Sequence, residues 1–155
     1  MHKQHTLPTA ARTAVGKGIN LAAESAEFVL QVCQHCKAMQ YPPRELCKDC
    51  LHNELEWEQV VTSGKLISWT ILHASTNTFF REHLPRQIAL VKLDCGPTLF
   101  AHMACDNAKS GDRVYLLNRH DVSGAAVFIA IAEAGEEGAQ LNKLSTLLLP
   151  DTPGD

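Results

Sequence analysis

Two pairs of cysteines constrain this chain more than any other feature. Cys33 and Cys36 bracket two residues, Cys47 and Cys50 do the same, and ten residues separate the pairs. A two-residue gap lets both thiolates of a pair face one ion from a tight turn, and tetrahedral zinc prefers four such soft ligands. The pattern therefore predicts one structural Zn²⁺ per chain. Four protein ligands leave no position for an activated water, so this zinc is expected to stabilise the fold rather than to catalyse.

Other uses of the four cysteines remain open from the sequence. The alternatives are a rubredoxin-type iron site, a thiol–disulfide pair, and a site that has lost its metal. A redox pair favours the N-terminus of a helix in a βαβ unit, and Pro42 and Pro43 between the pairs do not fit such a unit. His35 and His52 are close enough along the chain to be alternative ligands. Because four thiolates already satisfy zinc, we expect these imidazoles to face solvent.

Two further cysteines have no assigned chemistry. A nucleophilic cysteine needs a lowered pKa and a partner that acts as a base. Cys95 follows Asp94, whose negative charge would raise the pKa of a thiol, and Cys105 lies three residues after His102. We expect both thiols to be buried or incidental, and we assign no catalytic residue.

Charge and hydropathy narrow the class of protein. The longest uninterrupted apolar run, Ala125 to Ala132, has eight residues, and a membrane span needs about 20. The first 18 residues contain no apolar core of a secretory signal, so we expect a cytoplasmic protein with reduced cysteines. The net charge is −3, and it is −6 once the basic first 23 residues are set aside. Such a body is a poor surface for nucleic acid, whose binding depends on neutralising phosphates.

The chain divides into five parts by composition. Residues 1–19 carry proline and two glycines and predict a flexible N-terminal arm, and 20–32 are rich in helix formers and predict a helix. The cysteine pairs lie in 33–59, the zinc ribbon, and 60–132 contain short β-type segments. Residues 133–155 are expected to form a C-terminal tail. Its apolar LSTLLL run suits an arm that docks on something, a last strand or an ordered tail.

Five segments predict strands because β-type residues alternate there between turn signals. They are Leu66–His73, Ile88–Leu93, Thr98–Met103, Asp112–Leu117 and Val127–Ile131. Five short strands in about 70 residues favour an oligonucleotide/oligosaccharide-binding (OB) barrel, and a small sandwich is the rival. In the first segment Ile67, Trp69 and Ile71 share one face. We expect Trp69, like Trp57, to belong to the core.

The motifs together resemble a known family. YPPRELCKDC, LEWEQV, SGKLISWTILH and IALVKLDCGPTLFAHM occur in this order, as in zinc-ribbon/OB-fold accessory proteins that partner thiolase-like enzymes. The resemblance covers roughly residues 28–131. It implies a mainly β fold with an N-terminal helix, a rubredoxin-like zinc ribbon and then a five-stranded OB-type barrel. Lys37 and Leu51 depart from the pattern, since such knuckles often have glycine there, and this could alter the knuckle geometry.

The resemblance also implies a function. Members are non-catalytic subunits that bind a thiolase-like catalytic subunit in a hetero-oligomer and help to form its site for an acyl-CoA thioester. A chain of this size resembles the small subunit of a thiolase for an aromatic acyl-CoA such as benzoylsuccinyl-CoA. Alternatives are a partner of a steroid side-chain aldolase and a single-stranded nucleic-acid binder.

The long connection 74–87 is the candidate contact for CoA or the partner. CoA presents phosphates and an adenine, which favour cationic side chains and a stacking ring. Long ordered loops are often functional, and exposed phenylalanines suit a protein interface. Alternatively, one phenylalanine closes the barrel and the arginines are solvated. The candidate residues are Phe79, Phe80, Arg81, His83 and Arg86.

Overall fold

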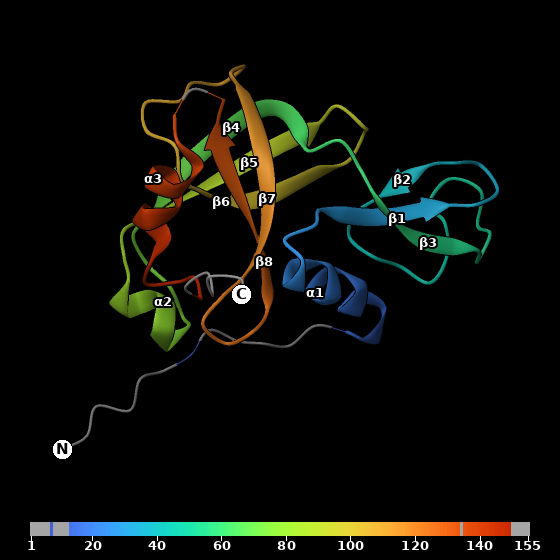
Figure 1. The fold of residues 1–155 in the computed structure, drawn as a ribbon, viewed down its shortest axis with the longest axis horizontal. Coiled ribbons are helices and arrows are strands. Elements are labelled where there is room, and N and C mark those ends of the chain that lie inside the picture. Colours follow the sequence, from blue (N-terminus) through green and yellow to red (C-terminus); the bar gives the residue numbers. More distant parts are fainter. Residues whose placement is uncertain (1–6, 8–12, 134, 150–155) are drawn as a thin grey trace.

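The described chain is built around two β-sheets of different size (Figure 1). The structure is a computed structural model and describes residues 7, 13–133 and 135–149. Its elements are, in order, η1 (Ala14–Gly16), α1 (Lys17–Glu24), β1 (Val29–Cys33), β2 (Met39–Gln40), β3 (Leu55–Gln59), β4 (Ser63–Leu72), α2 (Thr78–Glu82), β5 (Arg86–Leu93), β6 (Thr98–Met103), β7 (Arg113–His120), β8 (Ala126–Ala132), α3 (Glu137–Leu141) and η2 (Asn142–Leu144).

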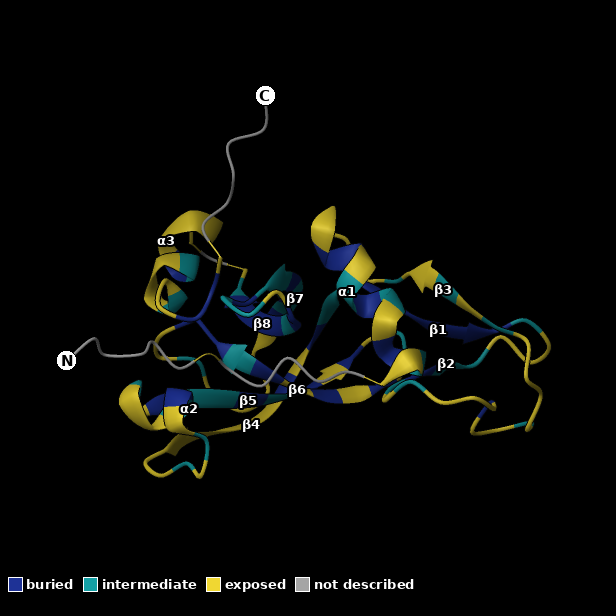
Figure 2. Ribbon diagram, turned by 90° about the horizontal axis from the view of Figure 1, so that it is seen from below, coloured by how far each residue is buried: buried dark blue, intermediate teal, exposed yellow. Residues whose placement is uncertain are grey.

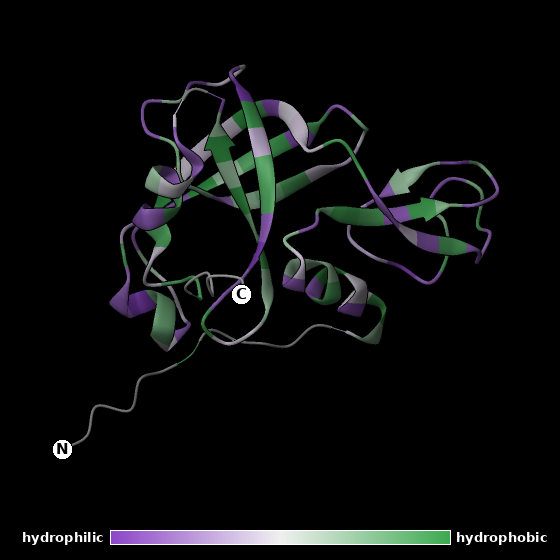
Figure 3. Ribbon diagram, in the orientation of Figure 1, coloured by the Kyte–Doolittle hydropathy of each residue, from purple (hydrophilic) through white to green (hydrophobic). Residues whose placement is uncertain are grey.

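The larger sheet is a closed barrel in the order β4-β5-β6-β8-β7. The paired strands are antiparallel except β6 and β8, which run parallel through His102–Ile129 and Met103–Ala130. Each of the five predicted segments is one barrel strand, so the five-stranded OB-type architecture is confirmed. Figure 3 shows apolar residues along these strands and hydrophilic ones concentrated in the loops.

The smaller sheet is the ribbon, in the order β2-β1-β3, and it shares a core with the barrel. Phe28 and Leu30 at the start of the ribbon are buried in one cluster with barrel residues such as Leu66 and Leu116. Trp57 is half-buried against this cluster, and a Cβ on Gly18 would lie 2.3 Å from its ring. Figure 2 shows buried positions of α1 and β1 where ribbon and barrel meet. The ribbon is therefore anchored to the barrel by apolar packing.

The helix predicted over 20–32 is wrong in its second half. α1 ends at Glu24, and Ala26 adopts a left-handed conformation (φ 55°) that lets Glu27 N–H donate to Ala22 O at 2.9 Å. This bonding closes the helix with a Schellman-type end. The residues that follow form β1, because all five of its positions pair with β3. Sheet pairing between distant segments outweighs their local helix propensity.

The predicted terminal arms are also partly structured. Residues 14–19 are helical rather than flexible, and most of the predicted N-terminal arm lies outside the described residues. In the C-terminal tail, Leu147 and Leu148 are buried on the outside of the barrel against Ile129 and Ile131 of β8. Backbone bonds from Val122 N–H to Leu147 O (2.8 Å) and from Leu149 N–H to His120 O (3.0 Å) tie this segment to the end of β7. The LSTLLL run thus docks on its own barrel.

The second half of β4 differs from the prediction. A register irregularity between Leu66 and Ser68 interrupts its pairing with β5, and β4 is exposed from Ile67 onward. Trp69 is 41% exposed, so its assignment to the core is wrong, and Ile67 and Ile71 are similarly exposed. The predicted apolar face of Ile67, Trp69 and Ile71 is therefore not covered by the rest of the barrel. Among the described residues, none of the helices is long and apolar enough to span a membrane.

Candidate metal centre and ligand cleft

The four cysteines of the two pairs converge at the end of the ribbon. Their sulfur atoms all lie within 4.8 Å of one another. Two of the separations, Cys33 Sγ to Cys50 Sγ and Cys36 Sγ to Cys47 Sγ, are 3.5 Å. A tetrahedron with Zn–S bonds of about 2.3 Å has edges of about 3.8 Å. The four thiolates therefore fit a single zinc ion with small adjustments of the side chains.

The two knuckles have the same backbone bonding. Lys37 N–H donates to Cys33 O at 2.9 Å, and Leu51 N–H donates to Cys47 O at 3.0 Å. Lys37 and Leu51 have φ values of 60° and 63°, the left-handed conformation that glycine adopts easily. The two departures from the family pattern therefore keep the knuckle conformation and accept its steric cost of about 1–2 kcal/mol each.

Hydrogen bonds hold the second knuckle in place. The backbone N–H of Asp49 donates to the Cys47 sulfur at 3.4 Å, a contact that favours the thiolate form that zinc binds. Behind it, Gln40 is almost fully buried, and its amide oxygen accepts from Lys48 N–H at 2.9 Å. Gln40 also donates to Gln31 Oε1 at 3.0 Å. This glutamine pair was not predicted from the sequence, where its only signal is that two polar residues occupy positions in short strands.

His35 and His52 lie side by side on the outside of the knuckles. Their rings stack with centroids 3.7 Å apart and an interplanar angle of 7°, and both residues are exposed. Their nitrogens and the Cys50 sulfur lie within 4.8 Å of one another. Since the four sulfurs already complete a tetrahedral set, the imidazoles are not needed as ligands.

The predicted contact loop is a short helix packed on the barrel. α2 begins after Asn77, whose side-chain oxygen accepts from Phe80 N–H at 3.3 Å. Phe79 is only 4% exposed and packs among the outer cluster that includes Ile131 and Leu147. The expectation that Phe79 is exposed is therefore wrong, because this ring covers the outside of β8. Arg81 is exposed and donates to Thr78 Oγ1 at 3.1 Å.

Arg86 is not a solvated arginine. It lies at the start of β5 and is only 9% exposed. Its guanidinium lies 4.9 Å from the centre of the Phe80 ring, and one of its amino groups donates to His102 Nδ1 at 2.9 Å. Burial, and secondly the charge of Arg86, lower the pKa of His102 to about 4. The imidazole is therefore neutral at pH 7 and accepts this hydrogen bond with its Nδ1 lone pair.

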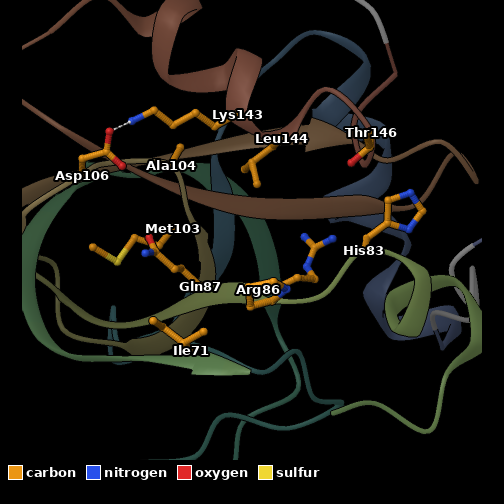
Figure 4. Close-up of a pocket in the computed structure, with 11 residues that line it drawn as sticks. Ile71, His83, Arg86, Gln87, Met103, Ala104, Asp106, Lys143, Leu144 and Thr146 are labelled. Carbon is orange, nitrogen blue, oxygen red and sulfur yellow. Dashed lines mark hydrogen bonds and ion pairs between the residues drawn. The ribbon is translucent and has the colours of Figure 1, made fainter. Parts of the chain in front are cut away.

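A cleft of about 280 Å³ opens beside Arg86 (Figure 4). Strands β4, β5 and β6 form one side, and the C-terminal segment forms the other. His83 lies at one end, where its Nδ1 and Phe79 O are 2.7 Å apart. Lys143 and Asp106 form an ion pair at the other end. The remaining lining residues are Ile71, Pro85, Gln87, Met103, Ala104, Leu144 and Thr146.

Two family models match consecutive parts of the chain. The rubredoxin-like zinc ribbon domain of ChsH2 matches residues 22–56, and the C-terminal OB-fold domain of ChsH2 matches residues 57–118. Together they span more than half of the 155 residues. The chain belongs to the ChsH2 family. The zinc-ribbon/OB-fold family that the sequence motifs indicated is thereby confirmed, and family and cysteine geometry together assign the cluster as a structural zinc site.

Known proteins similar to this ChsH2-family chain come from archaea and from an aldolase complex. A DUF35 domain-containing scaffold protein from Pyrococcus furiosus is 30% identical over 82 residues, which span 51% of this chain and only 60% of that protein. The solved structure of the Ltp2-ChsH2(DUF35) aldolase has a TM-score of 0.66 and 22% identity, covering 79% of this chain and 97% of that one. A DUF35-family protein of unknown function from Sulfolobus solfataricus has a TM-score of 0.52 and 16% identity, covering 76% and 86%. At these identities the two structures show the fold alone.

The ChsH2 models end before β8, so they do not reach the C-terminal side of the cleft. Lys143, Leu144 and Thr146 line the cleft from beyond the matched region.

The two cysteines outside the zinc cluster have raised pKa values. Cys105 follows the C-terminal end of β6 and is buried, and burial is the main cause that raises its pKa. Burial likewise raises the pKa of Cys95 in the β5–β6 turn. Raised pKa values make both thiols weaker nucleophiles at neutral pH.

The half-buried imidazole of His102 predicts a pH-dependent stability. The unfolded chain protonates this group below pH 6.5, whereas the folded chain resists protonation down to about pH 4, so stability is lost as the pH falls through this window. Between pH 7.5 and pH 5, wild type should lose about 2 kcal/mol more than His102→Gln, which keeps an acceptor for Arg86 but does not titrate. Urea unfolding at both pH values measures the difference, in which the shared pH dependence of the zinc site cancels. Equal losses would rule out a depressed pKa.

Proposed function

We propose that this chain is a non-catalytic accessory subunit that binds a thiolase-like catalytic subunit and helps to form its acyl-CoA site. The resemblance in the motifs supports the proposal, and the Pyrococcus furiosus relative is described as a scaffold protein. In this account the zinc stabilises the ribbon, and the catalytic groups belong to the partner. The reaction is acyl-CoA thiolysis, and an aromatic thioester such as benzoylsuccinyl-CoA is the proposed substrate class.

An exposed apolar face is the observation that carries the proposal. Phe100 of β6 is 69% exposed, although the C-terminal segment is already docked elsewhere on the barrel. In the sheet register, Ser68, Leu90 and Phe100 lie in one row across β4, β5 and β6. Large exposed aromatic residues of this kind are typical anchors of protein interfaces. We place the partner on this face rather than on Phe79, which is buried.

The proposed CoA contacts use the cationic side chains near α2. Arg81 is exposed and can reach a phosphate, and Phe80 and His83 are partly accessible. Arg86 lines the neighbouring cleft. CoA carries its phosphates at one end and its acyl group at the other, so two separate cationic positions suit an extended acyl-CoA. Both would complete a site whose reacting groups lie on the catalytic chain.

An aldolase is the alternative partner. The solved structure described as the Ltp2-ChsH2(DUF35) aldolase shares the fold of this chain over 97% of its own length. The family resemblance includes partners of both aldolases and thiolases, and both kinds of enzyme act on acyl-CoA thioesters. The accessory role of this chain would therefore be the same with either partner. Incubating the purified complex with CoA and a 3-ketoacyl-CoA, or with a 3-hydroxyacyl-CoA alone, distinguishes thiolysis from aldol cleavage.

Substitution of Phe100 tests the docking face. With the proposed catalytic partner co-expressed, Phe100→Glu should weaken the complex at least about thirtyfold, the effect of losing an interface anchor worth about 2 kcal/mol. Leu21→Glu is the matched control, because Leu21 is 64% exposed on α1, away from this face. Native mass spectrometry and size-exclusion chromatography measure the assembly. Wild-type affinity in Phe100→Glu would contradict the proposed surface.

A further inference from the structure

The guanidinium of Arg86 is a buried positive charge without a negative partner among the described residues. Its polar partner is the imidazole of His102, which supplies an acceptor but no charge. The ion pairs of the described chain join other residues, and Lys143 at the far end of the cleft is already neutralised by Asp106. Burial also lowers the pKa of Arg86, and no acidic group contributes to that shift.

A buried charge of this kind is costly unless something compensates it. Taking an ion out of water is strongly unfavourable, and arginine cannot relieve this penalty by losing its proton. The Phe80 ring recovers a small part through its π face. One of the five guanidinium N–H bonds is used by His102, and Figure 4 shows the group projecting into the cleft on the side of His83 and Thr146. The remaining donors are therefore directed at whatever occupies the cleft.

The other walls of the cleft select an amphiphilic ligand. Ile71, Met103 and Leu144 line it with apolar surface next to the guanidinium. A free inorganic ion would leave these walls unfilled, whereas an anionic group on a short hydrocarbon stem would contact them and Arg86 together. The volume of about 280 Å³ lies just below the range of about 300–1,000 Å³ for whole drug-sized ligands. The cleft therefore suits one end of a larger molecule or a small organic acid.

We propose that this cleft binds the carboxylate of an organic acid or acyl group, with Arg86 as its counter-ion. This deepens the proposed function, on which it rests for the identity of the whole ligand: the carboxylate would belong to the acyl portion of an acyl-CoA. His102 is then a positioning residue that holds the guanidinium toward the cleft. A phosphate could supply the same oxyanion chemistry, and the experiment separates the two sources.

Methionine methyl NMR on the full zinc-loaded chain tests the cleft directly. Met103 lines the cleft, whereas Met39 lies in β2 of the ribbon and serves as an internal control. Benzoate should shift the Met103 methyl signal saturably and leave the Met39 signal in place. Benzamide has the same ring without the charge and should bind at least about tenfold more weakly. No benzoate response at Met103, or equal binding of benzamide, would overturn the proposal.

Two further arms identify the cation and the anion. Arg86→Gln should weaken benzoate binding at least about tenfold, and Arg81→Gln, which alters an exposed arginine outside the cleft, should not. If Arg86→Gln does not fold, the benzoate and benzamide contrast in wild type still decides the question. A Met103 response to inorganic phosphate with none to benzoate would overturn the carboxylate assignment. Because these arms need no partner, a failed cleft and a failed accessory role are told apart.

Discussion

Replacing Cys47 by serine should release the zinc and unfold the ribbon. Cys47 is fully buried in the second knuckle, and the strands of the ribbon are short, so we expect their arrangement to depend on the metal. Structural zinc contributes apparent binding free energies of about 10–16 kcal/mol, which is as large as the whole stability of a typical domain, about 5–15 kcal/mol. Because Phe28, Leu30 and Trp57 also pack against the barrel core, the barrel should lose stability as well.

Metal analysis together with circular dichroism measures this outcome. Wild type should contain about one zinc per chain and no iron, and Cys47→Ser should contain far less than one. Cys95→Ser is the matched control, since Cys95 lies in the β5–β6 turn outside the cluster of four sulfurs. A metal-free Cys47→Ser protein with an intact ribbon would contradict the account of the zinc site.

Truncating one leucine of the C-terminal segment should have the next largest effect. Leu147 is fully buried between α2 and the outer face of β8. Removing a buried leucine side chain costs about 2–5 kcal/mol, depending on how far the surroundings collapse. Leu147→Ala should therefore lower the free energy of unfolding by this amount. It should also weaken benzoate binding, because the same segment supplies Leu144 and Thr146 to the cleft.

Leu149→Ala is the control in the same segment. Leu149 is 44% exposed, so its truncation should change stability by no more than about 0.5 kcal/mol. Urea unfolding of both variants at neutral pH gives the comparison. Equal and small effects would show that the segment does not dock on the barrel, and would remove one wall of the proposed cleft.

The zinc ribbon and the barrel strands could be predicted because their signals are local. Cysteine spacing determines which thiolates can share an ion, and alternation of β-type residues determines where a strand runs. The helix predicted over 20–32 was wrong in its second half because β1 pairs with β3, and this pairing joins residues more than 20 positions apart that a local pattern does not connect. The assignment of Trp69 to the core was wrong because the alternating pattern shows which side chains share a face but not whether another element covers that face.

The candidate ligand residues show a similar division. The sequence identified Arg86 and Phe79 as members of an unusual loop, but their environments are set by distant segments. Phe79 is buried by Leu147, and Arg86 is held by His102, which is 16 residues away. A local sequence pattern does not indicate such contacts between distant segments. Their outcome reverses the simple expectation: the phenylalanine is covered, and the arginine is a buried charge beside a cleft.

Isothermal titration of an acyl-CoA into the assembled complex tests the central claim most directly. We expect the complex of this chain with its catalytic subunit to bind acyl-CoA at least about tenfold more tightly than the catalytic subunit alone. Arg81→Ala and Arg86→Ala in this chain should remove most of that gain while the complex stays assembled. An affinity that is the same with and without this chain would contradict its role in forming the acyl-CoA site.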